Sequence, residues 1–432
     1  MSVFRELRAL LARSGFRKLF AVRLVSQAGD GMFQVGLANL LFFSPESHGS
    51  APAIAGAFAV MLAPFTVVGP FAGVFLDRWQ RRQVLVVGNA VRVVITAAMA
   101  VLMVADGVSV WIYVLGLAAL SVNRFLLAGL SAGLPLVVED KKLLLTANAL
   151  TPTLGAGAAF LGGLSAFVVG QVAPPGQIQD ATALTCAAVV MGGASLLGLR
   201  LGRSELGPVV PADGRLGREI VVVARGLADG ARYLTARRTP GQALLAMAAH
   251  RFCYGVVFIA SILMARNLLA DGDPASGLAV FAQVVGATGV GGGLAIVVTA
   301  GIGRRMAPQS WIATMLVVAA ASQLLLVPVE PGLVLVLGAA GLLGMAAQGA
   351  KIAVDTIVQR DSSDEFRGRA FAFFDVLYNA AFVGAAALAA AVVPDMGWSP
   401  GLFAVLAGVY LVAGMLVGFR GAREPREIAA AV

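Results

Sequence analysis

Polar residues recur at helical spacing within a long apolar stretch near the start of the chain. Intervals of 4, 3 and 4 residues separate Arg23, Gln27, Asp30 and Gln34. These intervals put all four side chains on one face of a helix. An unpaired charged carboxylate is costly in an apolar medium, so Asp30 is a candidate for reversible protonation. The alternative is a permanent ion pair with a buried arginine such as Arg92 or Arg124, and the sequence leaves both possibilities open.

A second polar stripe lies in an apolar stretch of the C-terminal part. Intervals of 3, 4 and 4 residues separate Gln348, Lys351, Asp355 and Gln359. Lys351 and Asp355 are one helical turn apart, so the simplest interpretation is a local ion pair near the membrane surface.

A third group of polar residues surrounds one of the two histidines. His250 shares a helical face with Tyr254 and Ser261, and Arg251 lies beside that face. Such a histidine can relay protons, but a histidine held by hydrogen bonds within a packed core is the alternative. Further along, Asp375 precedes Asn379 by one helical turn, a spacing that serves helix packing or substrate binding equally well.

The chain that carries these stripes is poor in charge. Of its 432 residues, 59% are hydrophobic and 13% charged, whereas soluble domains have about 25% charged residues. A bilayer core about 30 Å thick needs roughly 20 helical residues to cross it. Runs of that order cover residues 16–43, 52–76, 83–104, 109–134, 143–171, 180–200, 241–267, 275–300, 309–328, 332–355, 369–393 and 399–420. Because lipid offers backbone groups no hydrogen bonds, these runs predict an all-α membrane protein with twelve transmembrane helices.

One long polar connector, residues 201–240, divides the chain into an N-terminal six-helix half at 1–200 and a C-terminal half at 241–432. Apolar residues at helical spacing between Glu219 and Leu234 favour an amphipathic helix along the membrane surface. A linker with some helicity is the alternative.

The two halves of the sequence show a weak internal repeat. Arg81 and Arg82 follow the second predicted helix, as Arg304 and Arg305 follow the eighth. Lys142 and Arg369 precede the fifth and eleventh helices at nearly the same offset. This repetition predicts two pseudo-symmetric halves, a layout that transporters use to hold a substrate between them.

Basic residues concentrate in the segments on the side of the N-terminus, whereas Arg266 is the one basic residue on the opposite side. The positive-inside rule therefore places both termini and the 201–240 connector in the cytoplasm. The same distribution argues against nucleic-acid binding, despite a net charge of +9.

The chain has too few cysteine and histidine residues, too far apart in sequence, for several other classes of function. Cys186 and Cys253 lie apart in apolar runs, and His48 is the second histidine. A disulfide framework, a metal centre and a phosphate-binding loop are all excluded. We expect no enzyme activity and no cofactor.

The segment Gly73-Val-Phe-Leu-Asp77-Arg78-Trp-Gln-Arg81-Arg82 resembles the signature between the second and third helices of the major facilitator superfamily. Three further segments are similar to the drug-exporter branch that includes macrolide efflux proteins and an enterobactin-type siderophore exporter. They are Gln27-Ala-Gly29-Asp30, residues 145–150 and residues 366–369. Residues 158–163 depart from that branch, because the Gly-Pro of its antiporter motif is missing.

The resemblance implies transport by alternating access. It assigns the switch between states to Gly73, Asp77, Arg78, Arg81 and Arg82. In the resembled fold, the first, fourth, seventh and tenth helices line the cavity. The candidate substrate residues are Gln27, Gln34, Arg124, His250, Arg251, Tyr254, Gln348, Lys351, Asp375 and Asn379. Since basic residues outnumber acidic ones within the predicted helices, we expect anionic or zwitterionic amphipaths to be favoured.

Export of an amphipathic small molecule or drug, with proton antiport as a candidate coupling, is our first functional prediction. The alternative is a transporter or flippase of a lipid or other anionic envelope metabolite, without a requirement for protons. The expected partners are the substrate, protons and membrane lipids, and no nucleic acid. We expect a monomer in a bacterial cytoplasmic (inner) membrane.

Overall fold

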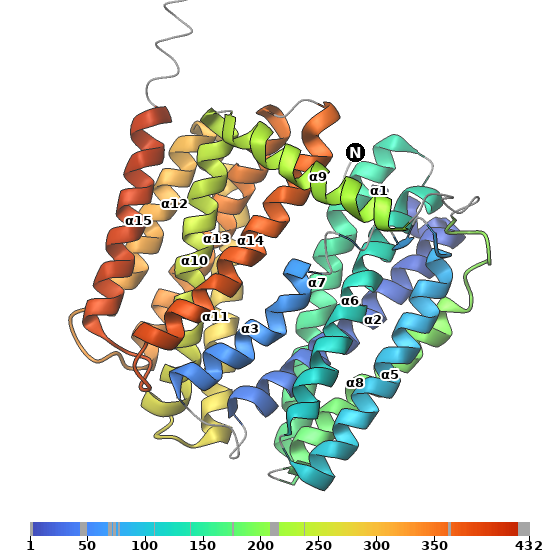
Figure 1. Ribbon diagram of the computed structural model, residues 1–432, viewed down its shortest axis with the longest axis horizontal. Helices are drawn as coiled ribbons and strands as arrows, with labels where there is room; N and C mark the ends of the chain where they lie inside the picture. Colours follow the sequence, from blue (N-terminus) through green and yellow to red (C-terminus); the bar gives the residue numbers. More distant parts are fainter. Residues whose placement is uncertain are drawn as a thin grey trace, which may run out of the picture. The chain divides into compact units, whose positions relative to one another are not determined.

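The computed structural model is built of helices (Figure 1). It describes residues 3–43, 50–67, 71, 75–76, 78–107, 109–138, 140–174, 177–207, 216–236, 238–361 and 364–421. Each of the twelve apolar runs contains one long helix, and the predicted all-α membrane fold is confirmed. Gly73 and Asp77 of the predicted gating motif lie outside the described residues.

The chain forms two compact units. The first comprises Met1–Ser47 and Ala63–Val222. Its helices are α1 (Val3–Ala12), α2 (Ser14–Ala38), α5 (Arg81–Asp106), α6 (Val110–Val137), α7 (Lys141–Val172) and α8 (Gln177–Gly198), and α2 continues into a π-helical turn, Asn39–Phe43. In this unit α2 packs between α7 and α8, and α5 lies along α8 and α6 (Figure 1).

The second unit comprises His48–Leu62 and Val223–Val432. Its helices are α10 (Arg238–Leu263), α11 (Pro274–Gly301), α12 (Pro308–Leu324), α13 (Leu333–Asp361), α14 (Asp364–Val392) and α15 (Pro400–Gly421), with short helical turns at Met264–Leu268 and Gly303–Arg305. The closest packing joins α11 to α13, and α12 to both α13 and α15. A further helix, α9 (Leu216–Ala236), covers the part of the connector for which the sequence predicts an amphipathic helix.

Nine helices among the described residues are long and apolar enough to cross a membrane on their own. Of the twelve helices in the apolar runs, the other three fall short for simple reasons. Both α12 and α3 (Ala51–Val67) have 17 residues, and α2 carries the polar stripe around Asp30. A charged stripe in a spanning helix requires partners from neighbouring helices.

The first part of α3 belongs to the second unit, although it precedes the connector by a long stretch of chain. The backbone N–H of Ala51 donates to Asp395 Oδ1 at 2.8 Å. The Phe58 ring lies 5.2 Å from that of Phe258 and 4.8 Å from that of Phe382. An acidic acceptor at a helix N-terminus and aromatic packing explain this placement.

Glycines allow two helices of the first unit to approach to backbone contact. A Cβ atom on Gly31 of α2 would lie 1.8 Å from the carbonyl oxygen of Ala159 in α7. One on Gly162 of α7 would lie 2.0 Å from the carbonyl oxygen of Ala28. Small residues are needed wherever membrane helices pack this closely.

The second unit uses the same device between α11 and α13. A Cβ atom on Gly291 would lie 1.8 Å from the carbonyl oxygen of Gly341, and one on Gly344 would lie 2.1 Å from that of Thr288. These two helices form one wall of the cavity described below.

Candidate functional site

The polar face of α2 provides the first candidate site. Asp30 Oδ1 lies 2.7 Å from a terminal nitrogen of the Arg92 guanidinium on α5. The Gln34 amide donates to the other carboxylate oxygen at 2.7 Å, and Arg92 also donates to Asn123 Oδ1 at 3.1 Å. The Arg92 side chain is fully buried, and 9% of the Asp30 side chain is exposed. The structure thus shows an ion pair between Asp30 and Arg92, while reversible protonation of Asp30 stays a prediction.

Nearer the N-terminus of α2, the same face contacts α7 instead. Arg23 Nε donates to Gln27 Oε1 at 3.1 Å, and both side chains pack against Gly155. The predicted stripe therefore splits between two neighbouring helices. Arg124, predicted as a cavity residue, is a half-buried residue of α6 in this unit.

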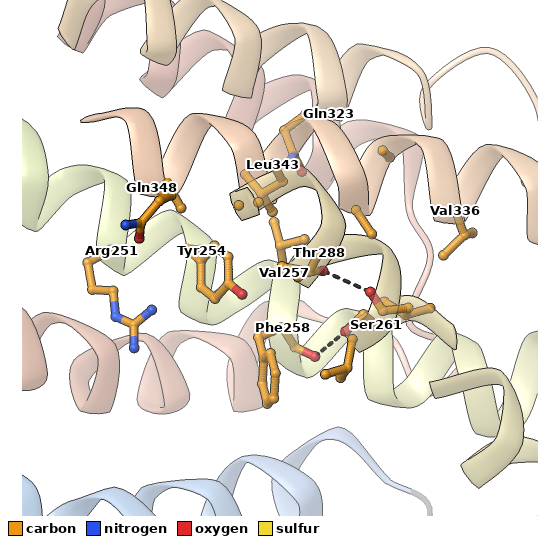
Figure 2. A pocket seen from close by; sticks show the side chains of 18 of the residues that line it. Arg251, Tyr254, Val257, Phe258, Ser261, Thr288, Gln323, Val336, Leu343 and Gln348 are labelled. Atoms are coloured by element: carbon orange, nitrogen blue, oxygen red, sulfur yellow. Dashed lines mark hydrogen bonds between the residues drawn. The ribbon is translucent and has the colours of Figure 1, made fainter. Parts of the chain in front are cut away.

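A cavity of about 360 Å³ lies in the second unit, between α10, α11, α12, α13 and α14. Four of the predicted substrate residues line it: Arg251, Tyr254, Gln348 and Lys351. Figure 2 shows three of these, Arg251, Tyr254 and Gln348, at one end of the lining, with Val336 toward the other end. The rest of the lining is mostly apolar, so the cavity is amphipathic along its length.

Arg251 contacts aromatic rings at the polar end of this cavity. Its guanidinium carbon lies 3.6 Å from the ring centre of Phe382, 4.3 Å from that of Tyr378 and 5.2 Å from that of Tyr254. Such cation–π contacts hold the guanidinium in place without neutralising its charge. Its Nε atom is buried and has no hydrogen-bond acceptor among the described residues.

Lys351 differs from Arg251, because it has an acidic partner. Its Nζ lies 2.6 Å from Asp355 Oδ2, the local pair that the spacing suggests. Both side chains are partly exposed.

His250 lies next to Arg251 in sequence but does not line the cavity. It is 1% exposed, and neither ring nitrogen has a hydrogen-bond partner among the described residues. Its ring lies 5.3 Å from that of Tyr410 and 6.2 Å from that of Tyr254. The arrangement is a histidine packed among aromatic rings, without the hydrogen bonds that a packed histidine usually makes.

Two other predicted cavity residues flank the lining instead of forming it. Asp375 is exposed, and the Asn379 amide donates to its backbone oxygen at 2.8 Å. Tyr378, between them, lines the cavity and contacts Arg251. The candidate list omits both Tyr378 and Phe382, although their one-turn spacing puts the two rings on one face of α14.

Of the predicted gating motif, the structure describes the three arginines, Arg78, Arg81 and Arg82. Arg82 Nε donates to the carbonyl oxygen of Leu201 at 2.7 Å, and Arg81 donates to that of Leu206 at 3.1 Å. Both arginines thus hold the segment that follows α8, where a positive charge favours the negative end of the helix dipole. Arg78 lies in the turn just before α5.

Comparison with known proteins shows what this fold is. No protein-family model matches the chain. Two uncharacterized MFS-type transporters, Mb0038c of Mycobacterium bovis and Rv0037c of Mycobacterium tuberculosis, are each 34% identical over 421 residues, which cover 96% of this chain and 92% of theirs.

Solved structures agree at the level of the fold. The nucleoside transporter NupG matches with a TM-score of 0.65 at 14% identity, covering 93% of this chain and 97% of NupG. A mutant of the peptide transporter POT matches with a TM-score of 0.70 at 14% identity, covering 95% and 94%. The chain therefore belongs to the major facilitator superfamily, as a multi-pass membrane transporter and not an enzyme.

Proposed function

We propose that this transporter exports an amphipathic small molecule, which it binds in the cavity of the second unit. The observation that carries the proposal is the polarity of that cavity. Arg251, Tyr254 and Gln348 lie toward one end (Figure 2). The remainder is mostly apolar, with Val336 and Leu343 among its residues, and Ser261, Thr288 and Gln323 are its polar members. A molecule with one polar group and an apolar body matches both ends.

The size of the cavity supports a small substrate. Its volume of about 360 Å³ lies near the lower end of the range for sites that bind drug-sized ligands, roughly 300–1,000 Å³. A lipid with two acyl chains exceeds such a space, so the observation favours a drug-sized molecule over a whole phospholipid.

The second candidate function, transport of a lipid or other anionic envelope metabolite, rests on charge. Both basic side chains in the lining, Arg251 and Lys351, attract anions, and no acidic residue belongs to the described lining. This function requires no proton coupling.

For the exporter we propose proton antiport through Asp30. A proton that binds its carboxylate competes with Arg92, which now holds it at 2.7 Å. Alternating access would expose the carboxylate to each side in turn. The protein would act in a bacterial cytoplasmic membrane, with both termini in the cytoplasm.

The exporter proposal can be tested by filling the cavity. Leu343→Trp places a large ring in the lining, whereas Leu245→Trp adds the same ring to a residue that is 69% exposed on α10. Candidate drugs are first identified by ligand-dependent thermal stabilisation of the purified protein. Their uptake into inverted membrane vesicles is then measured.

We expect uptake by the unaltered protein and by Leu245→Trp, and little uptake by a folded Leu343→Trp variant. Equal uptake by both tryptophan variants would show that the substrate does not use this cavity. Export of a two-chain lipid in the same assay would favour the second candidate.

A further inference from the structure

We propose that Arg251 is an anion-binding residue and that the substrate of this cavity is a monoanionic amphipath. The inference rests on the proposed function for its site and adds the charge class of the ligand.

Only one of the two cations in the lining has its charge balanced by the described residues. Lys351 is paired with Asp355 at 2.6 Å. The described lining contains no Asp or Glu, and the Arg251 guanidinium lies against the rings of Phe382, Tyr378 and Tyr254. Arginine cannot discharge itself by losing a proton in a protein. Counting Arg251 and Lys351 against Asp355, the polar end of the cavity carries about one net positive charge.

The surroundings of Arg251 suit a ligand oxygen. Its Nε is buried without an acceptor among the described residues. Tyr254 and Gln348 come from two other positions in the lining and supply a hydroxyl and an amide at the same end of the cavity as Arg251 (Figure 2). A carboxylate matches the planar fork of a guanidinium with two parallel hydrogen bonds. The rings beside the guanidinium make its surroundings less polar than water, which strengthens such a pair.

The remainder of the cavity decides what is attached to the anion. Val336, Leu343 and Leu326 belong to its apolar lining, and Phe281 adds an aromatic ring. A net charge of about +1 at the polar end is balanced by a ligand with one negative charge. A carboxylate or sulfonate with an apolar body therefore fits better than a doubly charged phosphate. The same chemistry describes a drug-like acid and a single-chain lipid acid.

The test uses the purified full-length protein in nanodiscs and three probes of equal chain length: decanoate, decyltrimethylammonium and decanol. Binding is measured by calorimetry for the unaltered protein and for Arg251→Gln and Arg251→Lys. Arg360→Gln is the matched control, because it removes the same charge from an exposed residue at the end of α13.

We expect decanoate to bind more tightly than the other two probes. Arg251→Gln should weaken decanoate binding about 10- to 100-fold, the loss for a charge-assisted hydrogen-bonded pair. It should leave decanol binding unchanged. Arg251→Lys should recover part of the loss, and Arg360→Gln should have no effect. Thermal unfolding of each variant confirms that it is folded, and if Arg251→Gln is not, the ranking of the three probes on the unaltered protein decides.

Binding of decyltrimethylammonium or decanol as tightly as decanoate would overturn the inference. Full affinity of a folded Arg251→Gln variant for decanoate would do the same. The export assay separates this inference from the proposed function. If the unaltered protein exports cationic amphipaths and Leu343→Trp does not, the cavity is the export site but its preference for anions is refuted. A single-chain phosphodiester that competes with decanoate would identify a lipid source for the anion.

Discussion

Asp30 and Arg92 form a buried ion pair between α2 and α5, with 2.7 Å between carboxylate oxygen and guanidinium nitrogen. The Arg92 side chain has no exposure, so its charge depends on Asp30 and Asn123 for compensation. Removing one partner of such a pair leaves a charge buried without compensation, which costs more than the pair itself contributes.

Asp30→Asn should therefore destabilise the protein by about 3–5 kcal/mol. The double variant Asp30→Asn with Arg92→Met should recover most of that loss. It removes both charges, and methionine fills the space of the arginine with an apolar side chain. Denaturation in detergent, followed by circular dichroism, measures both. A double variant less stable than Asp30→Asn would show that Arg92 is stabilised mainly by other contacts.

The Asp30→Asn variant also tests whether transport is coupled to protons. If Asp30 carries the proton, Asp30→Asn should abolish transport driven by a pH gradient and preserve exchange of labelled for unlabelled substrate. The measurement uses proteoliposomes with an imposed gradient, and the double variant with Arg92→Met serves as a folded control that also lacks the carboxylate. Normal pH-driven transport by a folded Asp30→Asn variant would end the coupling hypothesis and favour the lipid or anionic-metabolite transporter.

Close packing between α2 and α7 predicts a contrast between two glycines of α7. Gly162→Ala places a methyl group against the Ala28 carbonyl and should destabilise the protein by roughly 1–3 kcal/mol. Gly157→Ala is the control, since its Cβ meets nothing within 4 Å. Thermal unfolding compares the two, and equal melting temperatures would show that the helices can separate at little cost.

The gating motif predicts a change in rate and not in affinity. Asp77→Asn should slow transport while the substrate affinity stays nearly unchanged. Arg82→Gln should act in the same direction, because Arg82 Nε donates to Leu201 in the segment after α8 at 2.7 Å. Initial rates at matched expression and binding isotherms separate the two quantities. Unchanged rates would assign these residues to membrane orientation alone, and a loss of stability without a rate effect on the folded fraction would assign them to structure.

The topology prediction concerns single cysteines introduced into a variant without Cys186 and Cys253. An impermeant maleimide added to intact cells should label a cysteine at Asp273 and leave one at Arg215 unlabelled. Permeabilised cells provide the control, in which both should react. Labelling at Arg215 in intact cells would reverse the predicted orientation.

The amino-acid sequence by itself determined the helices and the local pairs. A run of apolar residues becomes a spanning helix because lipid leaves its backbone groups no other hydrogen bonds. Interactions one turn apart follow from helix geometry alone, and the Lys351–Asp355 pair is one of them. Arg251, Tyr254 and Gln348 could likewise be selected from their spacing and their polarity.

Only the tertiary structure decided which helices meet. It paired Asp30 with Arg92, where the sequence also allowed Arg124, and it brought Phe382 and Tyr378 of α14 around Arg251. It also placed Phe58 of α3 among aromatic residues of the second unit. The physical reason is that both the lipid-facing and the buried side of a membrane helix are apolar, so hydropathy does not encode its rotation. The rotation is decided by close packing, for which Gly31 and Gly162 provide the space, and by the few polar partners within reach.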